Sequence, residues 1–455
     1  MNPTPSNKPK AKPTASDKPK KSSVRHTRAI QRDQTKRPNV APPDEKVEEL
    51  LREVIQPATF SQVAHFHQLG LRERTLTLPV LVAFVLSLLW RHLGSIREGV
   101  RVLNEEGVLW TNALPVSPQA VLQRLRTLPP DLFANILEQV VPEMQNRYAQ
   151  RQRPLPEALA WATKHFTSVL ALDGSTLDAL SKKVGLLQQT PGNVLAGRMA
   201  ALLDVGSHLP QKVWYEEDSK AHDQTFWERA LDSLAANTLL LFDLGFVNYA
   251  FFDKLTEQQI HFVTRVKSNV ACTETHVLAS SANMRDSLVV LGKGKGQCQY
   301  PLRLVAVQYQ GKWYRYLTNV LDPTLLPPVY VVALYWERWR IEEAYMVVKR
   351  LLGLAYFACS AQNAILVQIW ATWILYAVLI DLTDAVAEEL KQPFAMISVE
   401  MVYRGLYHFS QAYHRGMADD PVVYLARKAS VLSIIKAKRP KSLDSVRLLT
   451  NQLRP

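Results

Sequence analysis

Cysteine is almost absent from this chain of 455 residues. Its three cysteines, Cys272, Cys298 and Cys359, lie far apart, and none belongs to a CxxC pair or to the Cys/His spacing of a zinc site. Such a sparse and odd set excludes a disulfide scaffold and favours a reducing compartment. The N-terminus is charged and rich in proline, so we also expect no secretory signal. These features predict a cytoplasmic protein.

Long apolar runs are scarce as well. Residues 364–380 form the most membrane-like run, about 17 residues that include Gln368 and Thr372, which is the lower limit for a membrane span. Residues 78–90 are too short to span. We expect both runs to be core helices of a protein with no membrane partner. The alternative, a membrane protein, predicts detergent dependence and leaves the acidic residues described below unexplained.

A nucleotide phosphate loop and an internal repeat are also missing. The segment GKGKG at 292–296 lacks the GK[ST] ending and the following helix that a phosphate loop needs. It is more typical of a flexible basic hairpin tip.

Positive charge is in excess. The chain has 54 Lys and Arg against 41 Asp and Glu, and its apolar content of 47% is ample for a buried core. Residues 1–40 carry 11 Lys and Arg and 2 Asp, which is most of the net charge of +13. We predict a disordered basic tail over 1–45, which attracts polyanions or serves only solubility. The remaining body is mildly basic, and nucleic acid is a plausible partner.

Residues 46–160 have helical patterns, with amphipathic runs near 46–55, 78–94 and 131–147. Ser117 and Pro118 have the N-cap and first-turn chemistry of a helix that carries Arg124 and Arg126. This helical domain either binds DNA ends through a groove or simply packs, and the sequence leaves both open.

The pattern changes to a mixed α/β core over 161–269. Short apolar runs at 167–172, 199–203 and 239–242 are each followed by an acid, and residues 261–267 alternate like a strand. Residues 270–330 have candidate strands near 288–291, 302–308 and 313–319, and we interpret them as a β-rich insertion. The core resumes over 331–390, and 391–455 is a helical, basic region.

The stretch 335–349, YWERWRIEEAYMVVK, is predicted to be one helix. Its spacing puts Tyr335, Arg338, Glu342 and Lys349 on one side, while a separate apolar stripe can face the core. A carboxylate in a row with two cations suits a metal-bound acid beside a polyanion. Spacing alone favours an ordinary Arg–Glu helix pair worth about 0.3–0.5 kcal/mol, and only the rest of the chain favours the metal site.

Three acids can be combined with that row. Asp173 and Asp243 end apolar strands and Glu342 lies on the helix, and such carboxylates are suitable ligands for Mg²⁺ or Mn²⁺. Two such ions about 3.5–4 Å apart can activate a water or a 3′-hydroxyl. Other acids compete by residue type, and Asp204 is the strongest because it also ends an apolar run. The others are Asp178, Glu216, Glu217, Asp218, Asp223, Glu337 and Glu343.

At these residues the chain resembles a known family. The row has the spacing Tyr-x2-Arg-x3-Glu-x6-Lys in full. This spacing resembles the signature of DDE transposases of bacterial insertion sequences, of the insertion-sequence-4 type. Residues 173–176, DGST, resemble the family's first acid motif, and residues 243–246, DLGF, resemble its second. The resemblance covers roughly residues 80–385.

The resemblance implies an RNase H-like mixed sheet flanked by helices and interrupted by the β-rich insertion. It also implies that Asp173, Asp243 and Glu342 hold two Mg²⁺ ions, which Mn²⁺ can replace. The family cleaves double-stranded DNA at transposon ends and joins the 3′-hydroxyls to target DNA, within a homodimer that holds two ends. Such a protein would act on the bacterial nucleoid.

The resemblance further implies DNA contacts. Tyr335, Arg338 and Lys349 would contact end-DNA phosphates, and Trp339 matches an aromatic position at a distorted strand. Arg265 and Lys267 follow the second motif on the next strand, and Trp313 or Tyr314 would stack on a flipped base. Core packing is the alternative for these aromatics. Relatives often carry Arg where this chain has Leu244, which leaves a hairpin intermediate open.

Two other functions fit part of the pattern. One is a catalytically silent DNA-binding relative, against which the intact acids argue. The other is a metal-dependent nuclease without strand transfer, against which the basic helical region argues.

Overall fold

The computed structural model describes residues 45–71, 74–177, 197–218, 221–246, 248–293, 297–354 and 361–437. The predicted basic tail up to residue 44, Cys359, Asp178 and the end of the chain from 438 lie outside these ranges.

Seven helices precede the first strand in the described part of the chain, as the helical pattern predicted. They are α2 (Glu45–Ser61), α3 (Val63–Gln68), α4 (Leu78–Trp90), α5 (Ile96–Glu105), α6 (Pro118–Thr127), α7 (Asp131–Gln150) and α8 (Glu157–His165). The predicted cap of α6 is present, because the Ser117 hydroxyl accepts a hydrogen bond from the Ala120 amide at 3.2 Å.

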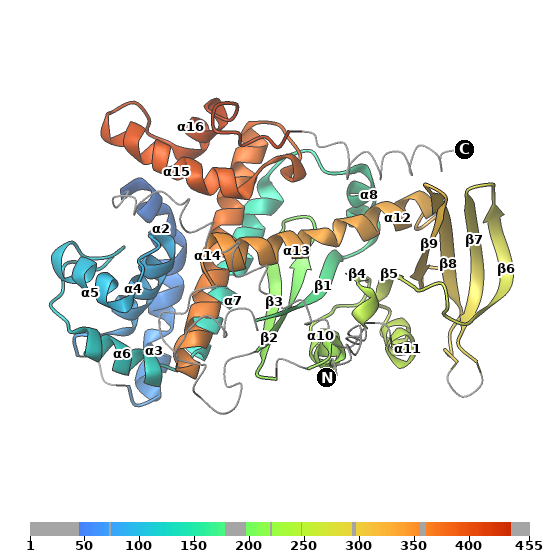
Figure 1. Cartoon of the computed structure of the whole chain (residues 1–455), viewed down its shortest axis with the longest axis horizontal. Helices are drawn as coiled ribbons and strands as arrows, with labels where there is room; N and C mark the ends of the chain where they lie inside the picture. The colour runs from blue at the N-terminus through green and yellow to red at the C-terminus, as the bar shows by residue number, and fades with distance from the viewer. Residues whose placement is uncertain are drawn as a thin grey trace, which may run out of the picture. The chain divides into compact units, whose positions relative to one another are not determined.

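A mixed nine-stranded sheet follows, in the order β3-β2-β1-β4-β5-β9-β8-β7-β6 (Figure 1). Its first half comprises β1 (Ser168–Thr176), β2 (Arg198–Asp204), β3 (Pro210–Glu216), β4 (Thr238–Phe242) and β5 (His261–Arg265). β1 is antiparallel to β2 and parallel to β4, and β4 is parallel to β5. This is the strand order of the RNase H-like fold, and the predicted fold class is confirmed.

Short helices connect these core strands. They are η2 (Asp223–Phe226), α10 (Trp227–Leu231), η3 (Leu244–Phe246) and α11 (Tyr249–Glu257). Their aromatic side chains pack with the apolar residues of β1, β4 and β5, so one face of the sheet is buried. Residues 239–242 of β4 are all fully buried, so the other face is covered as well, which explains why this core strand is a continuous apolar run rather than an alternating one.

The predicted β-rich insertion consists of β6 (Cys272–Ser280), β7 (Met284–Leu291), β8 (Leu302–Tyr309) and β9 (Lys312–Thr318). Its strands extend the core sheet, because β9 pairs antiparallel with β5. That pairing covers the edge of β5, which would otherwise leave backbone groups without partners. The GKGKG segment falls between β7 and β8, and residues 294–296 within it lie outside the described ranges.

After the insertion come α12 (Pro328–Glu337), α13 (Trp339–Met346), η5 (Val347–Leu351), α14 (Gln362–Glu389), η6 (Phe394–Met396), α15 (Val399–His414) and α16 (Pro421–Arg427). Within the described ranges, α14 is long and apolar enough to cross a membrane by length and composition, but 89% of its most apolar window is buried inside the protein. Trp373 of α14 donates to Met199 in β2, and Tyr376 donates to the carbonyl of His208. The helix packs on the sheet as the predicted core helix.

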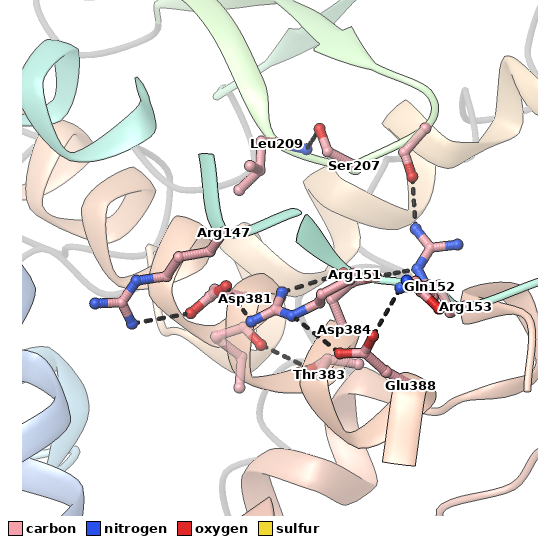
Figure 2. Close-up of polar contacts among 12 residues, drawn as sticks. Arg147, Arg151, Gln152, Arg153, Ser207, Leu209, Asp381, Thr383, Asp384 and Glu388 are labelled. Carbon is pink, nitrogen blue, oxygen red and sulfur yellow. Dashed lines mark hydrogen bonds and ion pairs between the residues drawn. The ribbon is translucent and has the colours of Figure 1, made fainter. Parts of the chain in front are cut away.

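A buried charge network joins the end of α7 to α14 (Figure 2). Arg151 contacts Asp381 at 2.6 Å and Asp384 at 3.1 Å. Arg153 pairs with the other oxygen of Asp384 and donates to the Gly206 carbonyl at 2.6 Å. Because the Arg153 and Asp384 side chains are each only 2% exposed, neither charge can be replaced by water contacts. The network thus ties the helical half of the chain to the sheet half.

We expect Asp384→Ala to lower the free energy of unfolding by about 3–5 kcal/mol, because buried Arg153 and partly buried Arg151 lose their shared carboxylate. Urea unfolding followed by tryptophan fluorescence measures the change. The control is Glu274→Gln, which breaks an exposed pair with Arg285 and should cost about 1 kcal/mol or less. Equal losses in the two variants would contradict a fastening role for the network.

Candidate active site

The predicted helix over 335–349 is present, but as three pieces rather than one. α12 ends at Glu337, α13 covers Trp339–Met346, and η5 is a π-helical turn. At Arg338 the backbone tightens to three-residue hydrogen bonds, with the Arg338 amide on Tyr335 and the Ile341 amide on Arg338. No Gly or Pro marks this break, so the sequence pattern could not reveal it. The break occurs at Arg338, whose side chain contacts the carboxylates of Asp173 and Glu342.

The apolar stripe of this region is buried as predicted. Ile341 and Val348 are fully buried and Tyr345 is 5% exposed. Tyr345 donates its hydroxyl to the Asp173 carbonyl at 2.7 Å. This contact docks α13 on β1 at Asp173, on the side of the helix that also carries Glu342.

The two strand acids lie side by side. β1 and β4 are parallel neighbours, and Leu172 and Phe242 form their last aligned pair. Asp173 and Asp243 each follow directly after that pair. β1 continues past Asp173 to Thr176, paired with β2, so Asp173 lies within the strand rather than at its end as expected. Strand acids at the carboxyl edge of parallel strands are well placed for a functional site.

Arg338 connects the helix acid to the strand acids. Its Nη2 donates to the Glu342 carboxylate at 2.8 Å, and its Nη1 lies 3.5 Å from the Asp173 carboxylate. The Arg338 side chain is only 4% exposed, and its Cζ lies 5.6 Å from the Tyr335 ring centroid and 5.3 Å from that of Trp339. One guanidinium thus lies between two carboxylates and two aromatic rings.

Tyr335 and Lys349 bond to the strand ends on either side of Arg338. The Tyr335 hydroxyl donates to Asp243 at 3.1 Å, and Tyr335 itself is 4% exposed. The Lys349 ammonium donates to the Ser175 hydroxyl. The structure therefore brings all four residues of the helical row to the edge that carries Asp173 and Asp243.

Burial dominates the electrostatics of this cluster. It raises the pKa of Asp173 to about 7, against the opposing charge of Arg338. Burial lowers the pKa of Lys349 to about 8. For Arg338, burial would lower the pKa, but Tyr335, Asp173 and Asp243 outweigh it and the pKa is raised. The carboxylates favour a cation, and Arg338 supplies it.

The donor set fits a hard divalent cation. The side chains are carboxylates, which Mg²⁺ and Mn²⁺ prefer. Across the described ranges no three acidic, His or Cys side chains converge on a single point as ion ligands, since Arg338 occupies the space between Asp173 and Glu342. The Arg338 Nε is buried without a hydrogen-bond partner there, so this guanidinium is incompletely satisfied where it lies.

Most competing acids have other partners. Asp204, the strongest competitor, pairs with Leu170 across β1 and β2, away from the carboxyl edge, and accepts hydrogen bonds from the Ser207 amide and hydroxyl at 2.7 and 2.8 Å. Glu337 and Glu343 both pair with Arg340, at 2.9 and 3.2 Å.

Asp223 is the competing acid that does lie beside the site. It pairs with Arg198 of β2, and its carboxylate packs against the glycines that follow the two strand acids. Its charge also adds to the raised pKa of Asp173, behind the larger effect of burial. Nothing in its sequence spacing distinguished it from the other acids, because its loop is brought there only by the fold.

The remaining predicted DNA contacts lie on β5, β9 and α13. Arg265, the last residue of β5, has its Cζ 5.4 Å from the Tyr314 ring centroid in β9. Lys267 is exposed just beyond it. Trp313 and Trp339 are 49% and 48% exposed, so neither is a core residue, whereas Tyr314 is half-buried.

Comparison with known proteins is consistent with this site. Residues 164–378, which contain all three acids, match the family described as Transposase DDE domain. The chain is 26% identical over 256 residues to a "Putative transposase y4zB" of Sinorhizobium fredii, covering 50% of this chain and 70% of that protein. It is 22% identical over 366 residues to a "Probable transposase for insertion sequence element IS5377" of Geobacillus stearothermophilus, covering 76% of this chain and 90% of that protein.

The raised pKa of Asp173 predicts a pH-dependent stability. Because the pKa is raised from its ordinary value of 3.8 to about 7 in the fold, the protonated carboxyl stabilises the fold at low pH, and this stability is lost as pH rises from about 4 through 7. In EDTA, we expect Asp173→Asn to raise the melting temperature relative to wild type by more at pH 8 than at pH 5, where only part of this stability has been lost. The shift should be about 1 °C for each kcal/mol relieved, because the entropy of unfolding is about 2.1 cal/mol/K per residue and the chain is long.

Differential scanning calorimetry at both pH values measures this difference. The control is Asp322→Asn, because the Thr324 side chain lowers the pKa of that exposed carboxyl and its removal should bring no gain at pH 8. An offset between Asp173→Asn and wild type that is independent of pH would show that Asp173 titrates normally.

Proposed function

We propose that the chain is the transposase of a bacterial insertion sequence, since its residues 164–378 match the family described as Transposase DDE domain. It binds the terminal repeats of its element, cleaves the DNA at the ends by metal-dependent hydrolysis and joins the 3′-hydroxyls to target DNA. This is cut-and-paste transposition, carried out in the cytoplasm on double-stranded DNA.

One observation carries this proposal. Two adjacent parallel strands place Asp173 beside Asp243, and the Arg338 guanidinium joins Asp173 to Glu342, although the three acids lie far apart in the chain. A merely structural Arg–Glu helix pair would not need a second carboxylate from the sheet. The arrangement supports the three-acid assignment that the sequence predicted.

The three carboxylates would hold two Mg²⁺ ions, for which Mn²⁺ can substitute. When bound, the ions would supply Lewis-acid activation of a water and then of a 3′-hydroxyl. Tyr335 orients the Asp243 carboxylate through its hydroxyl, and Tyr345 holds the β1 backbone at Asp173. Arg338 neutralises the acids in the protein alone and is close enough to the same site to meet a DNA phosphate.

We assign phosphate contacts to Arg338, Lys349 and Tyr335, as the resemblance implies. For Tyr335, which is buried with its hydroxyl on Asp243, such a contact would share that hydroxyl between carboxylate and DNA. Exposed Trp339 and Trp313 are the candidates to stack on distorted or flipped bases. Tyr314, Arg265 and Lys267 complete the proposed DNA surface.

The full Tyr335, Arg338, Glu342 and Lys349 row also supports membership of the insertion-sequence-4 type. That type implies a homodimer when two ends are bound. The helices before residue 160 are the proposed end-binding region.

The decisive experiment is cleavage and joining of a labelled duplex carrying the element's own end, with Mg²⁺. We expect Glu342→Gln to reduce strand cleavage on the order of 10²–10³-fold or more, as loss of an essential electrostatic group does. End binding in a gel-shift assay should persist, because the substitution keeps the side-chain shape. Glu343→Gln is the matched control, since Glu343 is the next residue but pairs with Arg340 on another side of α13.

The other outcomes separate the alternatives. If Glu342→Gln cuts as well as the wild type, Glu342 is not a metal ligand. If the wild type binds ends but never cuts, the chain is a silent DNA-binding relative. If it cuts but does not join, it is a nuclease without strand transfer.

A phosphate contact by Lys349 predicts a change in salt dependence. We expect Lys349→Met to weaken end binding and to reduce the slope of log affinity against log salt by about 0.9. Because the pKa of Lys349 is lowered to about 8, its charge is present below that pH and lost above it, so wild-type binding should weaken between pH 7 and 9. Fluorescence anisotropy measures both effects.

Lys164→Met is the control, because Lys164 is exposed in α8, which precedes β1. It should change neither the slope nor the pH response. A Lys349→Met slope equal to that of the wild type would rule out the phosphate contact.

A further inference from the structure

The two strand acids are followed by glycines that face the same carboxylate. Gly174 comes directly after Asp173, and Gly245 comes two residues after Asp243. A Cβ placed on Gly174 would overlap the Asp223 Oδ1 atom, and a Cβ on Gly245 would lie 2.8 Å from the Asp223 Oδ2 atom. Both separations are shorter than an ordinary van der Waals contact. Because glycine has no Cβ, these two positions leave room for the Asp223 side chain between the ends of β1 and β4.

Arg198 holds Asp223 in place against Gly174 and Gly245. It pairs with the Asp223 carboxylate and donates a second hydrogen bond to the Ala221 carbonyl at 2.9 Å. Arg198 itself is the first residue of β2 and lies opposite Thr176 of β1. The pair of Arg198 and Asp223 forms a clamp that is anchored on β2, the strand beside Asp173. The helix η2, which begins at Asp223, packs against η3, which follows Asp243.

The pair is placed to act on the site without belonging to its ligands. The side chains of Arg198 and Asp223 are 17% and 20% exposed, so both are largely removed from water. An unpaired fourth carboxylate beside Asp173 would add repulsion, and Arg198 cancels it. The two oxygens of Asp223 each contact a different acid-bearing segment.

We propose that Asp223, clamped by Arg198, is a positioning residue that sets the separation between Asp173 and Asp243 for the metal ions. This inference rests on the proposed function, because it assigns a spacing role within the same site. The cause is geometric: one rigid carboxylate, fixed by an arginine on β2, lies in contact with the backbone next to each acid.

The test compares Asp223→Asn, Arg198→Met, Arg198→Lys and the double variant Asp223→Asn/Arg198→Met in the end-cleavage assay over a range of Mg²⁺ concentrations. A second readout without catalysis is Mn²⁺ binding to the protein–end-DNA complex, followed by the EPR signal of free Mn²⁺. End-DNA affinity and melting temperature are measured for every variant.

For Asp223→Asn we expect the Mg²⁺ concentration for half-maximal cleavage to rise about 10-fold or more and Mn²⁺ binding to weaken similarly, the scale known for residues that orient metal ligands. End-DNA affinity should stay within about twofold, because no DNA contact is removed. Arg198→Lys keeps the positive charge and should lose less than Arg198→Met. The double variant should be no worse than the more affected single variant, because the pair acts as one unit.

Gly245→Ala is an independent variant, since its Cβ displaces the Asp223 carboxylate without removing a charge. It should show the same shift in metal dependence. Glu274→Gln, which breaks a bidentate ion pair on the insertion, is the control and should leave metal dependence unchanged.

Unchanged metal dependence and Mn²⁺ binding in Asp223→Asn and Gly245→Ala, with a wild type that cuts, overturn the positioning role. Additive losses in the double variant overturn the clamp. If the variants lose the folded state, seen as loss of the melting transition, and Gly245→Ala shows no metal-specific shift, the result also counts against the positioning role. Failure of the wild type to cut would instead overturn the proposed function.

Discussion

The guanidinium of Arg338 is the interaction on which the site depends. It lies between the carboxylates of Asp173 and Glu342, one from the sheet and one from α13. Without a cation there, burial would leave two acids repelling each other in a poorly solvated place, which is costly. The same need for a cation is what the proposed divalent ions would meet, with Arg338 as the counter-charge of the protein alone.

The rest of the fold serves to present that cluster. Parallel pairing of β1 with β4 places Asp173 beside Asp243, and Tyr345 docks α13 on β1 so that Glu342 faces them. α14 packs on the sheet through Trp373, and the buried Arg153–Asp384 pair ties it to the segment after α7. Rigid elements of this kind hold a site more precisely than loops do.

The insertion is part of the same framework. Because β9 pairs with β5, exposed Trp313 lies on a strand that is continuous with the core sheet. An aromatic residue proposed to stack on a base is therefore fixed relative to the acids by backbone hydrogen bonds. Arg265, at the end of β5, lies between these two regions and contacts the ring of Tyr314.

The sequence by itself determined what depends on neighbouring residues: the core strands from their apolar runs, and the common side of Tyr335, Arg338 and Glu342 from helical spacing. Tertiary structure decided what depends on strand pairing and packing between distant segments. Strand register sends Asp204 away from the site, and a loop docked against two glycines brings Asp223 into it. Tertiary structure also decided the helix break at Arg338. An ion pair between Arg338 and Asp173 of the sheet accompanies the break, and no Gly or Pro nearby predicts it.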